Sequence, residues 1–319
     1  MLRFAYPLAL LASTSAAEAF ELSLPVACEP GETCLVQNLV DADPGPGRRD
    51  AFCGAATYDG HKGTDFRVVD LPAMREGVDV LAPAPGTVTA VRDGERDGLE
   101  DAVAVAGREC GNGLVIDHGD GWETQLCHLA RDSIRVARGA RVERGEAVGR
   151  MGLSGRTEFP HVHLSVRKDG RVIDPASGRA VEAANVSACA SDGSDASLWD
   201  ARAREAVRGD RTRILATGFA SAPVTGRDVL RGVSAPGASG PLVLYAHFMN
   251  LEPGDRVDLV IVGPGGVFAQ SSGEPIPSHK ATWTAYAGRR TVPPGDYEGT
   301  ARLYRDDRVI AERKATFTR

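Results

Sequence analysis

The sequence predicts a mostly β protein in two units, an antiparallel β core followed by a small β-sandwich of immunoglobulin-like type. The 319 residues include 37 Gly and 19 Pro but only 6% aromatic residues, a composition typical of a chain with many turns. Between residues 60 and 186, short β-rich runs alternate with turns and leave no room for repeated crossover helices, which favours antiparallel pairing. Beyond residue 214, alternating runs separated by Gly/Pro turns are typical of a small sandwich.

The N-terminus has the features of a secretory signal. A basic start and an apolar run precede the small-residue pattern Ala17-Glu18-Ala19, so we expect residues 1–19 to be removed before Phe20. No later apolar stretch approaches the roughly 18 residues that a membrane-spanning helix needs. We therefore expect an exported protein without a membrane span, either periplasmic or secreted.

The mature chain is predicted to begin with a loop-rich segment, 20–56, that packs on the core. Its stretch "DADPGPGRRD" supplies Pro, Gly and charge with little periodicity. The β core is expected over 57–190. We expect its strands in the runs 64–71, 79–93, 114–119, 122–129, 147–152 and 161–168.

A shift to small, polar and charged residues marks the predicted boundary between the two units. We expect a linker over 191–213, whose second half is able to form a short helix. The sandwich is expected over 214–319. It shows no residues at metal-ligand spacing, so its role stays open and it is a candidate surface for a protein partner.

Charge and cysteine content restrict the partners and the compartment. The formal net charge of −6 disfavours nucleic acid and anionic membrane surfaces, which need a basic patch. Six cysteines in an exported chain, with no Cys-x-x-Cys, predict three disulfides rather than a metal cluster. The predicted pairs are Cys28–Cys34 across a turn, Cys110–Cys127 across a hairpin that turns at 119–121, and by remainder Cys53–Cys189.

Three histidine motifs are unremarkable one at a time. His61 precedes Asp65 by four residues, a spacing that also occurs in polar turns. His161 and His163 share one face of a predicted strand, which also suits a half-buried strand with polar residues outward. His128 stands alone on the second arm of the predicted hairpin.

Together these motifs predict a catalytic zinc site. Such a site has three protein ligands with N or O donors and an open fourth position for water. Five candidates leave two histidines to handle protons and charge near that water, a surplus that a structural zinc site does not need. We therefore expect His61 and Asp65 to bind zinc in a hydrolase.

The sequence blocks "GHKGTDF", "LVIDHGDGWETQLCHL" and "PHVHLSV" resemble the signatures of the lysostaphin-like (LytM-type) zinc endopeptidases, which cut peptide cross-bridges in bacterial cell walls. The resemblance covers about 57–176. It implies that His61, Asp65 and His163 hold one Zn²⁺ per chain. It also implies that His128 and His161 flank the zinc-bound water and the scissile carbonyl, and that the substrate is a peptidoglycan peptide.

A rival interpretation is a non-catalytic LytM-type factor that binds the wall and activates another hydrolase. Such relatives typically lack one or more of the five positions, whereas all five are present here. The chain departs from the family pattern at Cys127, where a tyrosine is common, and at Glu158 and Phe159, where small residues are usual. The bond that is cleaved and the oligomeric state stay open.

Overall fold

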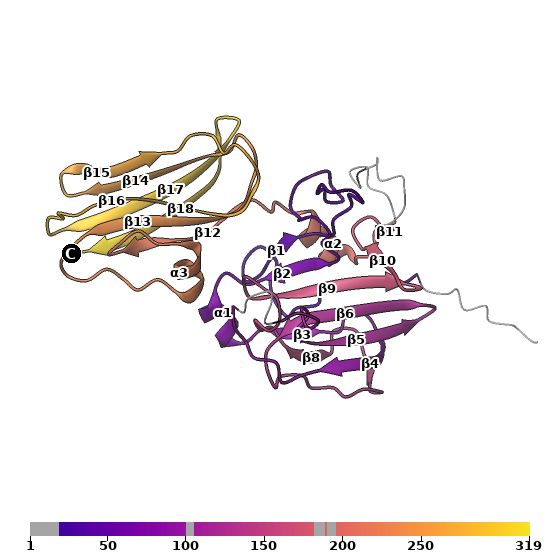
Figure 1. Ribbon diagram of the computed structural model, residues 1–319. Coiled ribbons are helices and arrows are strands. Elements are labelled where there is room, and N and C mark those ends of the chain that lie inside the picture. The colour runs from indigo at the N-terminus through magenta and orange to yellow at the C-terminus, as the bar shows by residue number, and fades with distance from the viewer. Residues whose placement is uncertain (1–18, 100–104, 182–188, 190–195) are drawn as a thin grey trace, which may run out of the picture.

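The computed structural model describes residues 19–99, 105–181, 189 and 196–319. The described chain is mostly β with antiparallel sheets, which confirms the predicted fold class. Figure 1 shows a large sheet built from the N-terminal half and a separate pair of sheets built from the C-terminal half. The predicted signal sequence lies outside the described residues except for Ala19. Among the described residues, no helix is both long and apolar enough to cross a membrane.

The first unit is organised by a nine-stranded sheet. Seven strands follow the order β1-β2-β9-β6-β5-β4-β7; β10 pairs with β9 and with β11, and β3 and β8 form a separate ribbon. The bounds are β1 Leu35–Asn38, β2 Thr64–Arg67, α1 Leu71–Glu76, β3 Asp79–Leu81, β4 Gly86–Arg92, β5 Asn112–Gly119, β6 Trp122–Leu129, β7 Arg141–Val142, β8 Ala147–Arg150, β9 His161–Lys168, β10 Arg171–Asp174 and β11 Arg179–Ala180.

The hairpin of β5 and β6 follows from its turn residues. Gly119 pairs with Trp122, so only Asp120 and Gly121 remain in the turn. Both have positive φ angles, 48° and 77°. Asp-Gly is a residue pair that tolerates this left-handed conformation, whose twist matches that of the flanking strands. The predicted hairpin is therefore confirmed.

All three predicted cysteine pairs are present as disulfides. Cys28 is bonded to Cys34 and Cys53 to Cys189. The third bond joins Cys110, which precedes β5, to Cys127 near the end of β6. This disulfide connects the two arms of the hairpin at its open end, next to His128.

The N-terminal segment and helix α2 (Ala201–Arg208) both contribute to the first core. Leu22 and Leu39 are buried there, and so are Ala203 and Val207 from one face of the helix. In the described part of the predicted linker, α2 therefore packs against the first core. The domain limits expected from the sequence stay predictions.

The second unit consists of two sheets that share one hydrophobic core. The sheets have the orders β12-β13-β16 and β15-β14-β17-β18, and their inner faces contribute side chains such as Phe248, Leu259 and Leu303. This is a sandwich architecture; its immunoglobulin-like class stays a prediction. The bounds are β12 Arg213–Ala220, α3 Gly226–Arg231, β13 Leu242–Leu251, β14 Arg256–Gly263, β15 Gly266–Ser272, β16 Lys280–Arg289, β17 Asp296–Arg305 and β18 Arg308–Thr318.

The sandwich packs directly against the first unit, and α1 and α3 lie close together (Figure 1). Leu230 of α3 joins Leu71 and Leu153 of the first unit in a small apolar cluster. The Asn250 side-chain amide donates to the Gln37 carbonyl over 2.7 Å. These contacts hold the sandwich beside the β1–β2 side of the large sheet.

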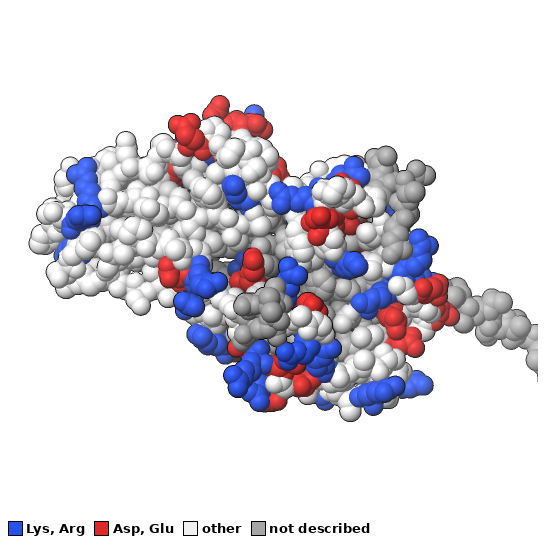
Figure 2. All heavy atoms as spheres, in the orientation of Figure 1, with Lys and Arg blue, Asp and Glu red and all other residues white. Residues whose placement is uncertain are grey.

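Charged side chains are distributed unevenly over the face shown in Figure 2. Lys and Arg are interspersed with Asp and Glu over the first unit, whereas much of the sandwich on this face carries neither. Interspersed charges of both signs largely cancel at a distance.

Candidate metal centre and catalytic histidines

Neighbouring strands of the large sheet carry most of the predicted site. On β2, Asp65 pairs with His163 of β9, and Asn38 of β1 pairs with Asp65 from the other side. His163 also pairs with Cys127 of β6, the residue before His128. Paired residues on adjacent strands lie side by side on one face. The opposite face of β9 is apolar and buried, with Val162 and Leu164 fully inside the core.

His61, Asp65 and His163 converge on one point. The Asp65 Oδ1 atom lies 3.2 Å from His61 Nε2 and 2.9 Å from His163 Nδ1. The two imidazole nitrogens are 3.1 Å apart. The structure thus brings together three donor atoms from a loop and two strands, and they form the one group of this kind found among the described residues.

Hydrogen bonds on the outer side of each ring determine which nitrogen faces inward. His61 Nδ1 lies 2.7 Å from the Leu39 carbonyl oxygen and therefore carries the proton. The Ser165 hydroxyl donates to the Lys62 carbonyl over 3.0 Å, so at the 3.0 Å contact with His163 Nε2 it accepts the imidazole proton. In a neutral imidazole of this tautomer, the inward His61 Nε2 or His163 Nδ1 atom carries a lone pair.

Two lone pairs and a carboxylate oxygen that face each other at 2.9–3.2 Å fit a cation at their centre. Tetrahedral zinc ligands at about 2.0–2.2 Å from the metal lie about 3.4 Å from one another. The observed separations come within about 0.5 Å of that value. The donor set therefore fits Zn²⁺, which prefers N and O ligands of this type.

Asp65 is held as a carboxylate with a defined orientation. Burial by itself raises the pKa of its carboxyl group, but the neighbouring His61 and His161 outweigh burial and lower that pKa well below the usual range. The Asn38 side-chain amide donates to Oδ2 over 2.8 Å, which leaves Oδ1 for the centre. Such outer partners orient metal ligands.

His161 and His128 stand beside this centre. The His161 Nε2 atom is 3.5 Å from Asp65 Oδ1. The centroid of the His128 ring is 4.6 Å from that of His161 and 6.1 Å from that of His163. All five residues predicted from the sequence therefore lie in one cluster.

The protons of His161 and His128 are also directed outward. His161 Nδ1 is 2.8 Å from the Phe159 carbonyl oxygen, and His128 Nδ1 is 2.8 Å from that of Ser154. Nε2 of each ring is consequently unprotonated. Burial lowers the pKa of both imidazoles, and for His128 the neighbouring His161 lowers it further. The lowered pKa values favour the neutral imidazole, which is able to accept a proton at Nε2.

His128 has an uncommon backbone conformation, with φ at 66°. Its amide donates to the Cys110 carbonyl and its own carbonyl accepts from Gly152, so both backbone groups are bonded. The adjacent Cys110–Cys127 disulfide adds a covalent restraint. A non-glycine residue in this region costs conformational energy and is held by its surroundings, a combination found at functional sites.

The outer partners of the candidate ligands, Ser165 and Asn38, were not predicted from the sequence. Ser165 follows His163 by two residues, so strand alternation alone places it on the same face and was a usable signal. Asn38 lies 27 residues before Asp65. Nothing in the sequence near Asn38 marks it as a partner of Asp65.

The remaining histidine of this region, His118, lies elsewhere on the hairpin. Its ring nitrogens contact the Pro85 carbonyl at 2.7 Å and the Thr124 hydroxyl at 2.8 Å. These two hydrogen bonds give His118 a structural role on the hairpin.

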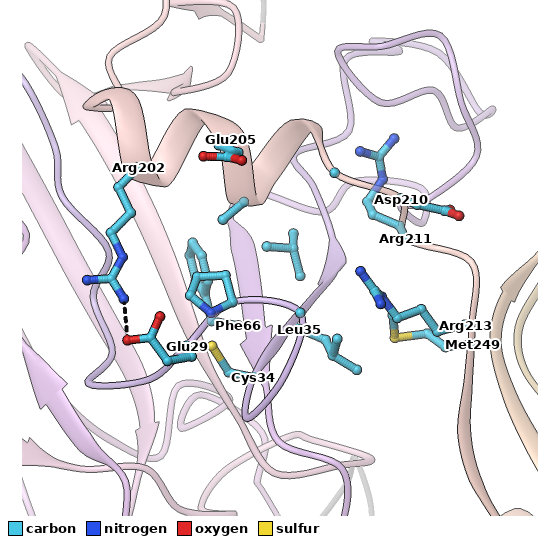
Figure 3. Close-up of a pocket in the computed structure, with 15 residues that line it drawn as sticks. Glu29, Cys34, Leu35, Phe66, Arg202, Glu205, Asp210, Arg211, Arg213 and Met249 are labelled. Carbon is cyan, nitrogen blue, oxygen red and sulfur yellow. Dashed lines mark hydrogen bonds and ion pairs between the residues drawn. The ribbon is translucent and has the colours of Figure 1, made fainter. Parts of the chain in front are cut away.

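A cavity of about 340 Å³ lies away from the cluster (Figure 3). It is bounded by the Cys34 loop, helix α2 and Arg213, and an Arg202–Glu29 ion pair of 2.9 Å lies at its edge. None of the five predicted site residues lines it.

Replacing Asn38 with leucine should weaken zinc binding without removing a ligand. The variant keeps a side chain of similar size but leaves Asp65 Oδ2 without its 2.8 Å donor. Loss of an outer partner typically costs about 10- to 100-fold in metal affinity. Competition with a coloured zinc chelator measures the change, and a Kd equal to that of the wild type would contradict the orienting role of Asn38.

Comparisons with known proteins identify relatives for the first unit. A family model described as Peptidase family M23 matches residues 59–175. An uncharacterized metalloprotease of Haemophilus influenzae is 29% identical over 139 residues, which are 44% of this chain and 25% of that protein. Peptidoglycan DD-endopeptidase ShyA of Vibrio cholerae is 32% identical over 114 residues, 36% of this chain and 22% of the relative. The chain thus spans a quarter or less of the length of these relatives.

Among solved structures, a zinc-containing peptidase from Vibrio cholerae is 28% identical, with a TM-score of 0.29. The match covers 44% of this chain and 39% of that one.

Proposed function

We propose that this protein is a zinc-dependent endopeptidase that hydrolyses the peptide cross-links of bacterial peptidoglycan. The premise is that residues 59–175, which match the family model, form a domain of peptidase family M23. The observation that carries the proposal is the complete cluster. Three donors converge within 4.8 Å of one another, and two neutral histidines stand beside them.

His61, Asp65 and His163 would hold the metal through Nε2, Oδ1 and Nδ1. When bound, zinc supplies a Lewis acid that lowers the pKa of water toward about 7 and polarises a carbonyl group. The hydrogen bonds of their outward nitrogens to Leu39 and Ser165 would hold the two histidine ligands in this orientation.

His128 and His161 would carry the proton transfers. Their unprotonated Nε2 atoms are able to accept a proton from the attacking water. A protonated imidazole then donates to the leaving amine, or to the carbonyl oxygen as negative charge develops on it. Positioned groups of this kind contribute typically 10²- to 10⁴-fold in rate. Their burial removes competing water, which strengthens these interactions.

The substrate class is supported by the relatives. ShyA is named a peptidoglycan DD-endopeptidase, and a further relative, from Neisseria meningitidis, is named DD-carboxypeptidase/endopeptidase Mpg and is 34% identical over 106 residues. A peptidoglycan substrate agrees with the predicted secretory signal and with the three disulfides, which support an oxidising compartment outside the cytoplasm.

The alternative is a non-catalytic factor that binds the wall and activates another hydrolase. One of the relatives is named for a role in cell division, the DipM protein of Caulobacter vibrioides, which is 30% identical over 116 residues. The intact set of donors and neutral histidines favours the enzyme, because binding alone requires no paired proton carriers.

The two functions are separated by incubating the purified mature protein, with and without added zinc, with defined cross-linked wall fragments. Mass spectrometry should detect products with one peptide bond hydrolysed, formed only with zinc. Their masses identify the bond. Intact fragments after prolonged incubation, together with stimulation of a second hydrolase, would favour the activator.

A further inference from the structure

A second cavity of about 340 Å³ lies where the sandwich meets the peptidase unit. Arg67, Thr157 and Phe159 line it from the peptidase side. Arg227 of α3 and His247 of β13 line it from the sandwich. Its volume suffices for one side chain or terminal group of a peptide, since a water molecule occupies about 30 Å³ in the liquid.

Arg67 places a cation inside this cavity. It lies two residues after Asp65 on the same face of β2 and pairs with His161 in the strand register. Its side chain donates to the Val68 and Val69 carbonyls over 2.9 Å each and to the Gln37 amide oxygen. The residue is 1% exposed. Among the described residues, no carboxylate forms an ion pair with it.

The charge on Arg67 persists despite its burial. An arginine guanidinium is not deprotonated in proteins, so Arg67 keeps its positive charge inside the fold. The Asp70 carboxylate accepts from the Ala73 amide as the N-cap of α1. A buried cation that is bonded to neutral oxygens and to no carboxylate favours an anion in the adjoining space.

The remaining charged groups of the cavity differ in exposure. Arg227 is exposed and adds a second positive charge. Glu158, the one carboxylate of the lining, is also exposed, so water screens it. His247 is neutral, because burial and the nearby Arg67 lower its pKa to about 4. The buried end of the cavity is therefore positive.

Phe159 connects the cavity with the catalytic cluster. The Arg67 guanidinium lies over the Phe159 ring at 4.6 Å, and that ring is 4.6 Å from the His161 imidazole. The Phe159 carbonyl also accepts the His161 Nδ1 proton. Cavity and cluster are thus separated by one aromatic ring, a distance that a short extended peptide spans at about 3.3 Å per residue.

We propose that the cavity binds a carboxylate of the peptide substrate, with Arg67 as the buried anchor and Arg227 as the cation at the entrance. This deepens the proposed function and rests on it, because it assigns the substrate class as peptides that carry a free carboxylate near the scissile bond. The sandwich then supplies one wall of a specificity site.

Binding is measured by titration calorimetry of the full-length mature protein with N-acetyl-D-glutamate, and with its neutral diamide in which both carboxylates are amides. The dicarboxylate should bind and the diamide should not. Acetate serves as a third probe: binding as strong as that of N-acetyl-D-glutamate would assign the cavity to free small anions and overturn the assignment to a peptide.

Two arginines of helix α3 provide a test variant and a matched control for this binding experiment. Arg227 lines the cavity and Arg231, also exposed, does not. Arg227→Ala should weaken dicarboxylate binding by about two- to fivefold, the range for an exposed ion pair, whereas Arg231→Ala should leave it unchanged. Arg67→Met should weaken it by roughly 30-fold or more, and Arg67→Lys should retain part of the affinity. Thermal unfolding of the Arg67 variants separates loss of fold from loss of the charge.

Equal binding of acid and diamide would overturn the proposal, and so would equal effects of the two α3 variants. The titration requires no hydrolysis, so it is independent of the proposed activity. If the protein binds the dicarboxylate but cuts no wall fragment, the carboxylate site stands and the endopeptidase function fails.

Discussion

The His163→Ala variant is expected to fold and to retain little zinc. The substitution removes the Nδ1 donor that lies 2.9 Å from Asp65 Oδ1 and 3.1 Å from His61 Nε2, so only two ligands remain. Two side chains form a poor zinc site. The loss of affinity should exceed the roughly 10- to 100-fold penalty for removing an outer partner. Metal analysis of dialysed protein measures zinc per chain, and hydrolysis of wall fragments should fall in parallel.

Asp65→Asn provides a second test of the same centre. It preserves the shape of the side chain and removes the negative charge that faces both imidazoles. Zinc content should again fall. Full zinc occupancy in both variants would show that other residues bind the metal and would refute the ligand assignment.

In contrast, His161→Ala is expected to preserve zinc and abolish most hydrolysis. His161 lies two residues before His163 on the same face of β9, but its Nε2 atom is 3.5 Å from Asp65 Oδ1, outside the triad of converging donors. No metal ligand is lost, so zinc content should match that of the wild type. The rate should fall by at least about 10²-fold, as expected when a positioned acid–base or oxyanion group is removed.

His128→Ala should behave in the same way from a different strand. His118→Ala is the matched control, because His118 lies on the same hairpin but contacts only Pro85 and Thr124 by its ring nitrogens. That control should retain both zinc and hydrolysis. If His161→Ala lost zinc as His163→Ala does, the two histidines would exchange roles; unchanged rates in His128→Ala and His161→Ala would refute the mechanism.

Local pattern was sufficient to predict much of the large sheet. Alternation in "HVHLSV" placed both histidines on one face and the valines and leucine on the other, as observed. Asp120-Gly121 marked the hairpin turn, because few residue pairs accept positive φ at both positions. The disulfide between Cys110 and Cys127 follows from that hairpin, since pairing of its arms brings both residues to the same end.

Long-range pairing was not predictable in the same way. Residues 20–56 have the composition of a loop, yet Leu35–Asn38 forms a strand at the edge of the sheet. Its β-bulge sets Asn38 opposite Asp65. This register depends on how the whole edge packs, and the four residues of the strand carry no signal for it.

The sequence by itself was enough to predict three cysteine pairs, two β units and the five residues of the proposed zinc site. Only the tertiary structure decided which nitrogen of each histidine faces inward, because the acceptors are backbone carbonyls such as those of Leu39 and Ser154. It also decided that one cavity is bordered by both Arg67 and Arg227, which lie 160 residues apart in the sequence. Contacts between the two units depend on how their cores pack against each other, whereas local sequence patterns describe each core separately.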